Sequence, residues 1–564
     1  MFSDHGHVNI LLGILLENGI DKAVFSPGSR NAPLVVSFSG DKKMETVVIP
    51  DERSAGFFAL GMAQQLKRPV CLVCTSGSAA LNYAPAISEA YYQNIPLIVV
   101  TADRPEYLIG QGDGQTINQK NIFGNYVQSS YSLPLDPKDE LNIHWCSRIV
   151  SEAISEAVNG ERGPVHINIP LEEPLYGKTE QPTSYRSFKT MKNDQEVALK
   201  DEKELLDLWN ASGKKMIICG LMHKDEYLNH LLDELASRPD VAVLVENTSN
   251  LYSDRFNHCI DRSLNSINMD QVEEFVPDLL IRIGGPIVSK KIKKLFRDHK
   301  PKFQWNLGRE NIYMDSFMSL THVINTEPSK FLSVVHQKTE PGDVSFGPLW
   351  KQIDYLVKDH QVEVLKSMPY CDLTAFYTIL DFIPEDSILQ MGNSSVVRYC
   401  QLFDPVKTVQ YFANRGTSGI DGSTSTAVGC AYMHKKKWIN FITGDISFFY
   451  DSNAFWNDYL EPNLVVFLIN NSGGSIFKII DGPGTTGALE KHFVASPVHA
   501  SAEYIAKAFN LEYLLIESLE ALESKMEEIY TYKETGRPKL VEISTKGIAN
   551  EDYLKDYFKQ IKKQ

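Results

Sequence analysis

The sequence predicts an α/β protein with three doubly wound domains, each built on a mostly parallel sheet. Short apolar runs alternate with helix-like segments along the chain, which is the pattern of repeated β-α units. These runs lack a polar face, as expected of parallel strands that are covered on both sides. Polar motifs follow the runs directly, at the strand ends where doubly wound sheets bind ligands.

Two polar, weakly periodic stretches divide this pattern. One runs from Gly177 to Lys200 and the other from Gln337 to Phe346. They predict an N-terminal domain over residues 1–180, a central Rossmann-like domain over 200–336 and a third domain over 347–564. The chain has 564 residues, enough for three or four domains.

The N-terminal domain is expected to begin with a helix and then to alternate. Each of its strands leads into a polar loop motif. The expected elements are helix Val8–Asn18, strands Ala23–Phe25 and Val47–Ile49, helix Ser54–Leu66, and strands Val70–Cys74 and Leu97–Val100.

The other two domains repeat the alternation. In the central domain no strand is followed by G-x-G-x-x-G, so the sequence shows no dinucleotide fingerprint there. The expected strands are Met216–Gly220, Val241–Val245 and Leu279–Gly284, followed in the third domain by Ser387–Met391, Trp438–Thr443, Leu464–Ile469 and Lys539–Ser544.

One unit of the third domain predicts a metal site. It reads strand, Gly444-Asp445 turn, a helix-like segment Ser452–Tyr459, strand, and Asn470-Asn471. Parallel strands end on the same sheet edge, so Asp445 and Asn471 are expected to meet although they are 26 positions apart. A carboxylate and an amide oxygen suit Mg²⁺, which takes further ligands from water and phosphate.

Composition limits the partners. The formal net charge of −15 argues against general binding of nucleic acid or anionic membranes. No apolar run reaches membrane-spanning length, and the start of the chain lacks a basic signal-peptide region. The C-x-x-C of Cys71 and Cys74 lies within a strand-like run, so a disulfide or zinc site there is not expected. We expect a cytoplasmic protein with reduced thiols.

The Gly-Asp and Asn-Asn pattern resembles the diphosphate-and-metal motif of thiamin-diphosphate enzymes. This resemblance implies thiamin diphosphate with Mg²⁺, or Mn²⁺ in its place, as cofactors. It also implies that Glu52 binds the aminopyrimidine ring of the cofactor and promotes loss of the thiazolium C2 proton. Without the metal motif, Glu52 would be read as a carboxylate favoured at a helix N-terminus; with it, Glu52 is the leading candidate. In this superfamily two chains share each site, which implies at least a homodimer, with a dimer of dimers as the alternative.

Five loop motifs carry a closer resemblance. SPGSRNAPL, DERSAGFFALGMA, TADRP, GNSSVVR and NRGTSGIDG are similar to those of the 2-succinyl-5-enolpyruvyl-6-hydroxy-3-cyclohexene-1-carboxylate (SEPHCHC) synthases of menaquinone biosynthesis. By position, the implied catalytic and substrate residues are Ser29, Arg30, Arg104, Gln115, Ser394, Arg398 and Arg415. The implied cofactor residues are Glu52, Ser394, Ile420, Gly444, Asp445, Ile446, Asn471, Gly473, Ile476 and Phe477, with Asp445, Asn471 and the Gly473 carbonyl as metal ligands.

The resemblance implies decarboxylation of 2-oxoglutarate and conjugate addition of the resulting succinyl carbanion to isochorismate. Arginine suits carboxylate recognition, and both substrates are dicarboxylates, which would explain four arginines in strand-end loops of an acidic chain. The family shows Lys-Arg in the central domain where this chain has Lys290-Lys291. Lysine keeps the charge but not the planar fork, so the role of this pair is left open.

Two alternatives stay open from the sequence. Another thiamin-diphosphate enzyme, such as an acetolactate-type synthase or a 2-oxo-acid decarboxylase, is the nearest. The chain has no His-His pair of the pyruvate-decarboxylase kind, and a small 2-oxo acid would not need four arginines. A binding protein that keeps the fold without catalysis is the second alternative, and the intact Glu52, Asp445 and Asn471 weigh against it.

Overall fold

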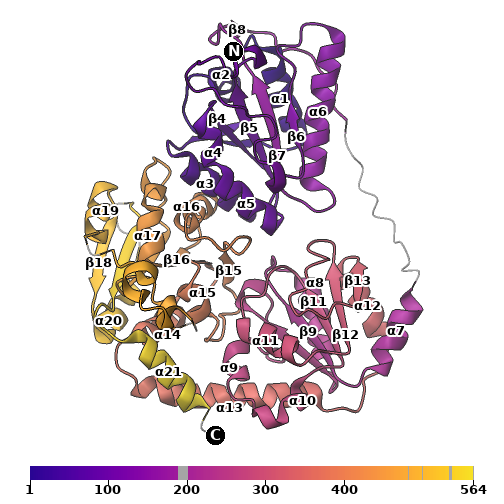
Figure 1. The fold of residues 1–564 in the computed structure, drawn as a ribbon, viewed down its shortest axis with the longest axis vertical. Helices are drawn as coiled ribbons and strands as arrows, with labels where there is room; N and C mark the ends of the chain where they lie inside the picture. Colours follow the sequence, from indigo (N-terminus) through magenta and orange to yellow (C-terminus); the bar gives the residue numbers. More distant parts are fainter. Residues whose placement is uncertain (189–200, 480–481, 498, 532–535, 563–564) are drawn as a thin grey trace.

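The structure is a computed structural model that describes residues 1–188, 201–479, 482–497, 499–531 and 536–562. It contains three α/β lobes arranged as a triangle (Figure 1). The described strands form three parallel sheets and a small two-stranded antiparallel pair. The predicted fold class, three doubly wound domains with parallel sheets, is confirmed.

The N-terminal lobe holds a parallel sheet in the order β3-β2-β4-β5-β7-β6. Its strands alternate their side chains between two cores, so Leu72 packs with α3 and α5 while Cys71 and Val73 pack with α1 and α6. The strands are β2 Lys22–Phe25, β3 Glu45–Val48, β4 Val70–Cys74, β5 Leu97–Asp103, β6 Ser130–Ser132 and β7 Val165–Pro170. The helices are α1 Gly6–Glu17, α2 Ala32–Gly40, α3 Glu52–Leu66, α4 Ser78–Asn82, α5 Ala84–Gln93 and α6 Glu140–Val158.

The predicted linker Gly177–Lys200 is only partly a linker. Strand β8 (Lys178–Thr179) pairs with β1 (Phe2–Ser3), and the Tyr185 ring packs against Gly13 of α1. This part of the segment belongs to the N-terminal lobe because it covers the start of the chain. Residues 189–200 lie outside the described residues.

The central lobe holds a parallel sheet in the order β10-β9-β11-β12-β13. Helices α7, α8 and α12 cover one face, while α9, α10, α11 and the start of α13 cover the other. The strands are β9 Lys215–Cys219, β10 Val241–Val245, β11 Leu279–Ile283, β12 Phe303–Gly308 and β13 His322–Asn325. The helices are α7 Glu202–Ala211, α8 Glu226–Ala236, α9 Ile260–Leu264, α10 Val272–Phe275, α11 Lys290–Asp298 and α12 Pro328–Lys338.

The C-terminal lobe holds a parallel sheet in the order β15-β14-β16-β17-β19-β18. Its strands are β14 Ile388–Met391, β15 Gln410–Ala413, β16 Ile439–Gly444, β17 Leu464–Asn470, β18 Glu512–Ile516 and β19 Lys539–Ser544. Its helices are α14 Asp372–Phe382, α15 Ser395–Cys400, α16 Ser423–Met433, α17 Asp445–Tyr450, α18 Ile476–Ile479, α19 Ala502–Ala508, α20 Leu519–Ile529 and α21 Asn550–Ile561.

The helix predicted over Ser452–Tyr459 is wrong. Helix α17 begins at Asp445, directly after β16, and residues Ser452–Phe455 form only a 3₁₀ turn. The Asp451 side chain accepts hydrogen bonds from the Ser425 backbone N–H and hydroxyl at 2.7 and 2.8 Å. These bonds tie Asp451 to α16 at the point where α17 ends.

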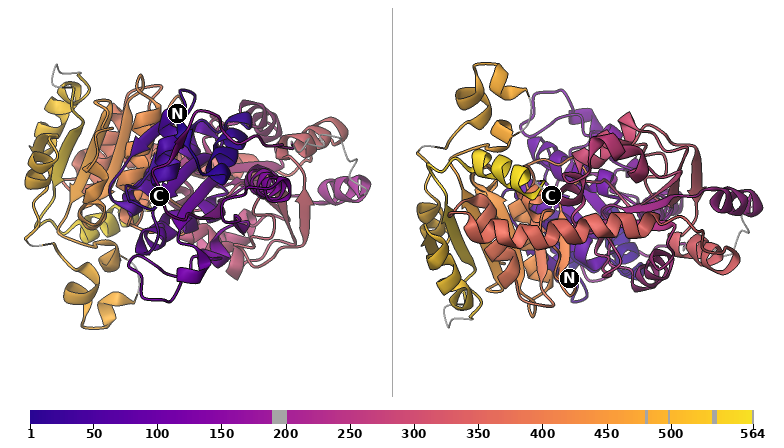
Figure 2. Two further views of the ribbon diagram at one scale, coloured as in Figure 1. Left: turned by 90° about the horizontal axis from the view of Figure 1, so that it is seen from above. Right: turned by 90° about the horizontal axis from the view of Figure 1, so that it is seen from below.

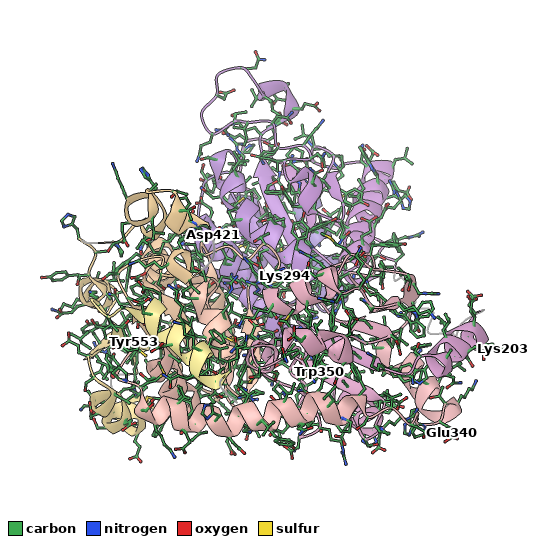
Figure 3. All side chains as sticks on the ribbon, turned by 60° about the horizontal axis from the view of Figure 1, so that its bottom comes forward. Lys203, Lys294, Glu340, Trp350, Asp421 and Tyr553 are labelled. Carbon is green, nitrogen blue, oxygen red and sulfur yellow. The ribbon has the colours of Figure 1, made fainter. Side chains whose placement is uncertain are left out.

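Helix α13 (Phe346–Ser367) joins two lobes. Near its start, Trp350 is fully buried in the core of the central lobe (Figure 3). Further along, Val357 and Val364 belong to the core of the C-terminal lobe. Seen from below, the helix runs across both lobes as one straight element (Figure 2). The predicted domain limits therefore stay a prediction, because one helix contributes to two cores.

The N-terminal and C-terminal lobes meet through α3 and α16. A Cβ atom added to Gly61 of α3 would lie 2.2 Å from the Thr426 carbonyl oxygen. One added to Gly429 of α16 would lie 2.2 Å from the Phe58 carbonyl oxygen. The two helices therefore touch backbone to backbone, and the apolar core is continuous between the lobes. Among the described helices, none is long and apolar enough to cross a membrane.

Candidate active site

Asp445 lies at the carboxyl edge of the C-terminal sheet. It is 1% exposed, and its two carboxylate oxygens accept the backbone N–H groups of Ile446 and Gly473, each at 2.7 Å. Burial raises the pKa of Asp445 to about 6, although these two hydrogen bonds act in the opposite direction. A buried carboxyl group with a raised pKa at a sheet edge is a candidate functional group.

Asn471 follows β17, which pairs in parallel with β16, so Asn471 comes to the same edge as Asp445. Its side-chain nitrogen donates to Asp372 Oδ2 at 2.7 Å and to Ser475 Oγ at 3.0 Å. A carboxylate only accepts, so the NH₂ group must face Asp372 and the amide oxygen is left for another partner. Asp372 thereby orients Asn471, and burial raises the pKa of Asp372 to about 6.

The turn after Asn471 has unusual backbone conformations. Ser472 and Gly473 have φ angles of +68° and +127°. A Cβ on Gly473 would lie 2.6 Å from the Val494 carbonyl oxygen, so this position needs glycine. The Gly473 carbonyl, a predicted metal ligand, accepts the Ser475 N–H at 2.9 Å and keeps a second lone pair.

Apolar residues border this turn. Ile476 is 9% exposed, and the rings of Phe477 and Phe493 lie 5.5 Å apart. Ile420 lies in the loop before α16, where its carbonyl oxygen accepts the Ser447 hydroxyl of α17 at 2.9 Å. A Cβ on Gly444 would meet no atom within 4 Å, so there is open space beside the start of α17.

Glu52 is the first residue of α3, in the N-terminal lobe. Its neighbours contact the C-terminal lobe of the same chain: Asp51 accepts from the Asn453 side chain at 2.8 Å, and Arg53 donates to the Tyr450 carbonyl at 2.8 Å. These contacts reach the end of α17 opposite to Asp445. Within the described part of the chain, no hydrogen bond or ion pair links Glu52 to Asp445.

Arg30 and Arg104 gather at the edge of the N-terminal sheet. Both lie near Asp103. Burial raises the pKa of Asp103, and the two arginines partly oppose this increase. Arg30 is 7% exposed and donates to the Leu171 carbonyl at 3.0 Å. Arg104 donates to the Gly114 carbonyl at 3.1 Å and thereby holds the loop that carries Gln115. Ser29 precedes Arg30 and is exposed.

Arg398 and Arg415 form a second pair at the edge of the C-terminal sheet. Burial lowers the pKa of both, and Arg415 lowers that of Arg398 further. Arg415 donates to Asn393 Oδ1 at 2.8 Å, and Arg398 donates to the carbonyl of Ser394. Ser394 itself has a φ angle of +70°. Among the described residues, no hydrogen bond or ion pair connects this pair with Arg30 or Arg104.

The central lobe faces the second arginine pair through Glu246. This carboxylate is 1% exposed and accepts the Val288 and Ser289 N–H groups at 2.7 and 2.8 Å. Burial raises the pKa of Glu246 to about 7, and nearby Arg415 partly opposes this shift. Glu246 and Glu89 lie near Arg415, and Asp261 lies near Arg398, so acidic groups offset the positive charge of this arginine pair.

The lysine side chains of α11 lie in different environments. The Lys291 ammonium lies 3.8 Å from the centre of the Phe558 ring, and Lys290 is exposed. Lys293 lies near both Glu246 and Arg415, and burial lowers its pKa. Lys293 is thus an α11 lysine that lies near Arg415, and the role of the Lys290-Lys291 pair stays a prediction.

A separate cleft of about 980 Å³ opens between the N-terminal and central lobes. Among the described residues that line it are Gln64, Asn94, His223, Arg309 and Glu310. None of the predicted site residues lines this cleft, so its volume does not locate the cofactor site.

Comparisons with known proteins agree with the geometry. Residues 7–122 match the family described as thiamine pyrophosphate enzyme, N-terminal TPP binding domain. The chain is 38% identical to SEPHCHC synthase of Flavobacterium johnsoniae, with 98% of both chains covered. It is 39% identical to that of Christiangramia forsetii, with 98% of both covered, and 35% identical to that of Bacteroides thetaiotaomicron, with 100% of both covered.

The chain belongs to the SEPHCHC synthase family. It is therefore a thiamin-diphosphate-dependent enzyme, as the loop motifs predicted. The family membership favours this interpretation over an acetolactate-type synthase. The sequence reasoning missed Asp372, Glu246 and Lys293. Asp372 has the ordinary signature of an acidic residue in the first turn of a helix, and Glu246 is a single acidic residue after a strand.

Proposed function

We propose that this enzyme decarboxylates 2-oxoglutarate and adds the succinyl unit to isochorismate, giving SEPHCHC in cytoplasmic menaquinone biosynthesis. The observation that carries this proposal is the pairing of arginines at two sheet edges: Arg30 with Arg104, and Arg398 with Arg415. Two dicarboxylate substrates carry four carboxylates, and these four arginines of a chain with net charge −15 match them in number.

The edge that carries Asp445 fits a bound metal and diphosphate. Asp445 offers a fixed carboxylate, Asn471 offers an amide oxygen that Asp372 orients, and Gly473 allows close backbone approach. These hard oxygen ligands favour Mg²⁺, with Mn²⁺ as a substitute. When bound, thiamin diphosphate supplies the nucleophilic carbon that decarboxylation and carbon–carbon bond formation require.

The residues of the chain bind and orient the substrates and neutralise their negative charge. Arg398 and Arg415 hold substrate carboxylates through paired N–H groups, and burial strengthens this attraction because little water competes. Ile476 and Phe477 exclude water from the apolar wall beside the cofactor. Glu52 would bind the aminopyrimidine ring of the cofactor and exchange a proton with it.

We further propose that each site forms between two chains. Glu52 of one chain would lie beside Asp445 of its partner, which accounts for the lack of a contact between them in one described chain. The minimal active unit is then a homodimer.

The test is CO₂ release from 2-oxoglutarate with and without isochorismate, at saturating thiamin diphosphate and Mg²⁺. We expect release to depend on isochorismate and to yield the six-membered-ring adduct in equal amount. Turnover of pyruvate to acetolactate at a higher kcat/KM would instead favour the acetolactate-type alternative.

A further inference from the structure

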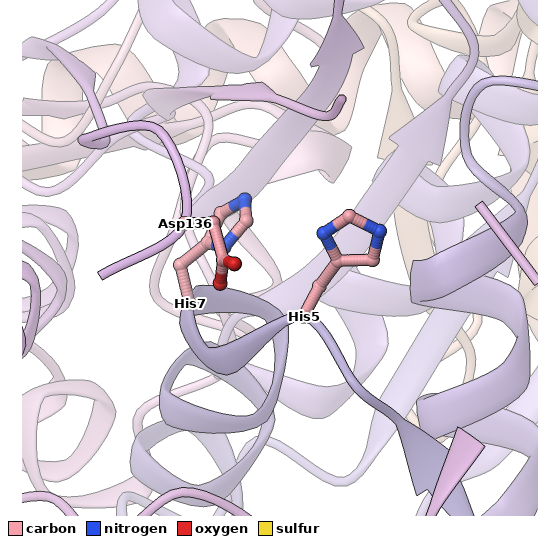
Figure 4. Close-up of side chains that lie close together, drawn as sticks. All are labelled: His5, His7 and Asp136. Carbon is pink, nitrogen blue, oxygen red and sulfur yellow. The ribbon is translucent and has the colours of Figure 1, made fainter. Parts of the chain in front are cut away.

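Two histidines and an aspartate lie together in the N-terminal lobe, outside the cofactor site. His5 precedes α1, His7 lies in its first turn, and Asp136 lies in the loop between β6 and α6. One donor atom from each residue lies within 4.8 Å of the others. Figure 4 shows the two rings turned toward each other, with the Asp136 carboxylate beside His7.

The hydrogen bonds of the histidines fix their tautomers. His7 Nε2 lies 3.0 Å from the Pro170 carbonyl oxygen, and His5 Nε2 lies 3.2 Å from that of Pro174. A carbonyl oxygen only accepts, so each Nε2 must carry the hydrogen. In the neutral rings both Nδ1 atoms are then unprotonated and carry a free lone pair.

His7 Nδ1 has no hydrogen-bond partner although it is buried. The His7 side chain is fully buried, and its Nδ1 lies 4.0 Å from Asp136 Oδ1, beyond hydrogen-bond distance. An unpartnered buried nitrogen is costly unless a ligand occupies the space in front of it.

We propose that His5, His7 and Asp136 bind Zn²⁺ through the two Nδ1 atoms and a carboxylate oxygen, with water as the fourth ligand. Metal-binding histidines characteristically donate their other ring N–H to a backbone carbonyl, as both rings do here. Donors at zinc bond lengths of about 2.0–2.1 Å lie roughly 3.4 Å apart, so the three groups must close by about 1 Å. Asp136 is 28% exposed, which gives the ion access; its Oδ1 accepts the Gly6 N–H at 3.2 Å, and its Oδ2 lies 3.7 Å from the Lys138 ammonium.

The bound ion would join the start of α1 to the loop that carries Asp136, and a third segment, residues 170–174, accepts the Nε2–H groups of the two histidines. The third segment also holds Arg30, which donates to the Leu171 carbonyl at 3.0 Å and pairs with Glu173 at 3.2 Å. Zinc would therefore stabilise the N-terminal lobe, including residues 170–174, which hold the proposed substrate residue Arg30. This site is independent of the proposed reaction.

The test uses the full chain without a histidine tag, saturated with thiamin diphosphate and Mg²⁺ so that the Asp445 site is filled. After incubation with Zn²⁺ and desalting, we expect one retained zinc per chain and a thermal midpoint raised by several degrees. Co²⁺ in place of zinc should give the intense visible absorption of a four-coordinate ion.

Two variants avoid the buried His7. Asp136→Asn and His5→Gln should each lower zinc affinity roughly 100-fold or more and abolish the Co²⁺ absorption. The matched control is His299→Gln, which removes a different histidine–carboxylate pair, with Nδ1 2.7 Å from Glu273, and should retain zinc. Failure of the parent chain to retain zinc, or equal retention by Asp136→Asn and the control, would overturn the proposal.

Discussion

Asp372 and Asn471, 99 positions apart in the chain, are joined by a 2.7 Å hydrogen bond that fixes the orientation of the asparagine amide. The bond joins the first turn of α14 to the end of β17, so it forms only when the C-terminal lobe is folded. Asp372 is thus a positioning residue for a proposed metal ligand.

Replacing Asp372 tests this role. In Asp372→Asn the new amide both donates and accepts, so Asn471 is no longer held in one orientation. We expect the apparent Mg²⁺ affinity, measured by thiamin-diphosphate binding at graded Mg²⁺, to fall by roughly 10–100-fold. The control Asp381→Asn changes an exposed aspartate on the same helix. Equal Mg²⁺ affinity in both variants would remove Asp372 from the site.

Glu52→Gln should bind the cofactor but lose most turnover. A general acid–base group contributes roughly 10²–10⁴-fold to rate, so kcat should fall within that range. Hydrogen–deuterium exchange at the reactive carbon of bound thiamin diphosphate measures the affected proton directly. The control is Glu106→Gln, which removes an exposed carboxylate paired with Lys120. Unchanged exchange in Glu52→Gln would exclude its proposed role.

Mixing two inactive chains tests the site between subunits. If Glu52 and Asp445 meet across a dimer, a heterodimer of Glu52→Gln and Asp445→Ala has one site with both changes and one with neither. Random reassociation should then restore about a quarter of the parent activity. If each site forms within one chain, every site carries a change and the mixture stays inactive. The measurement is specific activity after joint refolding, with each variant alone as control.

The four arginines should divide between the substrates. Removing one partner of a buried arginine–carboxylate pair costs about 2–5 kcal/mol, which is roughly 30-fold to several-thousand-fold in kcat/KM. We expect the Arg398→Ala and Arg415→Ala changes to raise one KM, and Arg30→Ala and Arg104→Ala to raise the other. Exposed Arg148→Ala should cost under about 1 kcal/mol. Four variants within threefold of the parent would contradict the dicarboxylate proposal.

The raised pKa of Glu246 predicts that the stability of the folded protein depends on pH. Its pKa rises from 4.5 to about 7 on folding, so the folded state binds the proton more tightly. Its contribution is fully present below about pH 4.5 and is lost as the pH rises through 7, a change of about 3 kcal/mol. Urea unfolding followed by tryptophan fluorescence should show this loss in the parent but not in Glu246→Gln. Glu226→Gln, an exposed change in the same lobe, should keep the parent profile.

Gly61→Ala should destabilise the contact between the outer lobes. The added methyl group would lie 2.2 Å from the Thr426 carbonyl oxygen, so α3 and α16 must separate. Overpacking of this kind costs about 1–3 kcal/mol, which should lower the thermal midpoint. Gly114→Ala is the control, because a Cβ there meets no atom within 4 Å. A thermal midpoint equal to that of the control would mean that the helices accommodate the methyl group.

The strands were the most predictable part of the fold. Val70–Cys74 and Val241–Val245 have the predicted bounds because each is a short, wholly apolar run between polar turns. Lys539–Ser544 also has its predicted bounds, although it includes Lys539 and Glu542. The approach of Asp445 to the end of β17 followed from parallel pairing of adjacent strands. Local patterns misplaced the helix after Asp445, since its end depends on Asp451 bonding to Ser425 in another element.

The supporting residues of the site could not be predicted in the same way. Asp372 and Glu246 act on residues that are distant in sequence, and no local pattern distinguishes them from ordinary acidic residues near helices and strands. Which α11 lysine lies near Arg415 depends on the rotation of this helix about its axis, which places Lys291 over the Phe558 ring of α21 and Lys293 near Arg415. That rotation is set by the burial of Ile292, Leu295 and Phe296.

Helix α13 has a consequence for interdomain motion. With Trp350 anchored in one core and Val364 in the next, a rotation of the central lobe against the C-terminal lobe must bend the helix or pull one anchor out. Helix α13 therefore fixes the separation between Glu246 and Arg415, which a flexible linker between the lobes would not do. Glu246 and Arg415 would therefore be in place before a substrate binds. Any opening that admits the substrate must come from loops rather than from a hinge rotation of these two lobes.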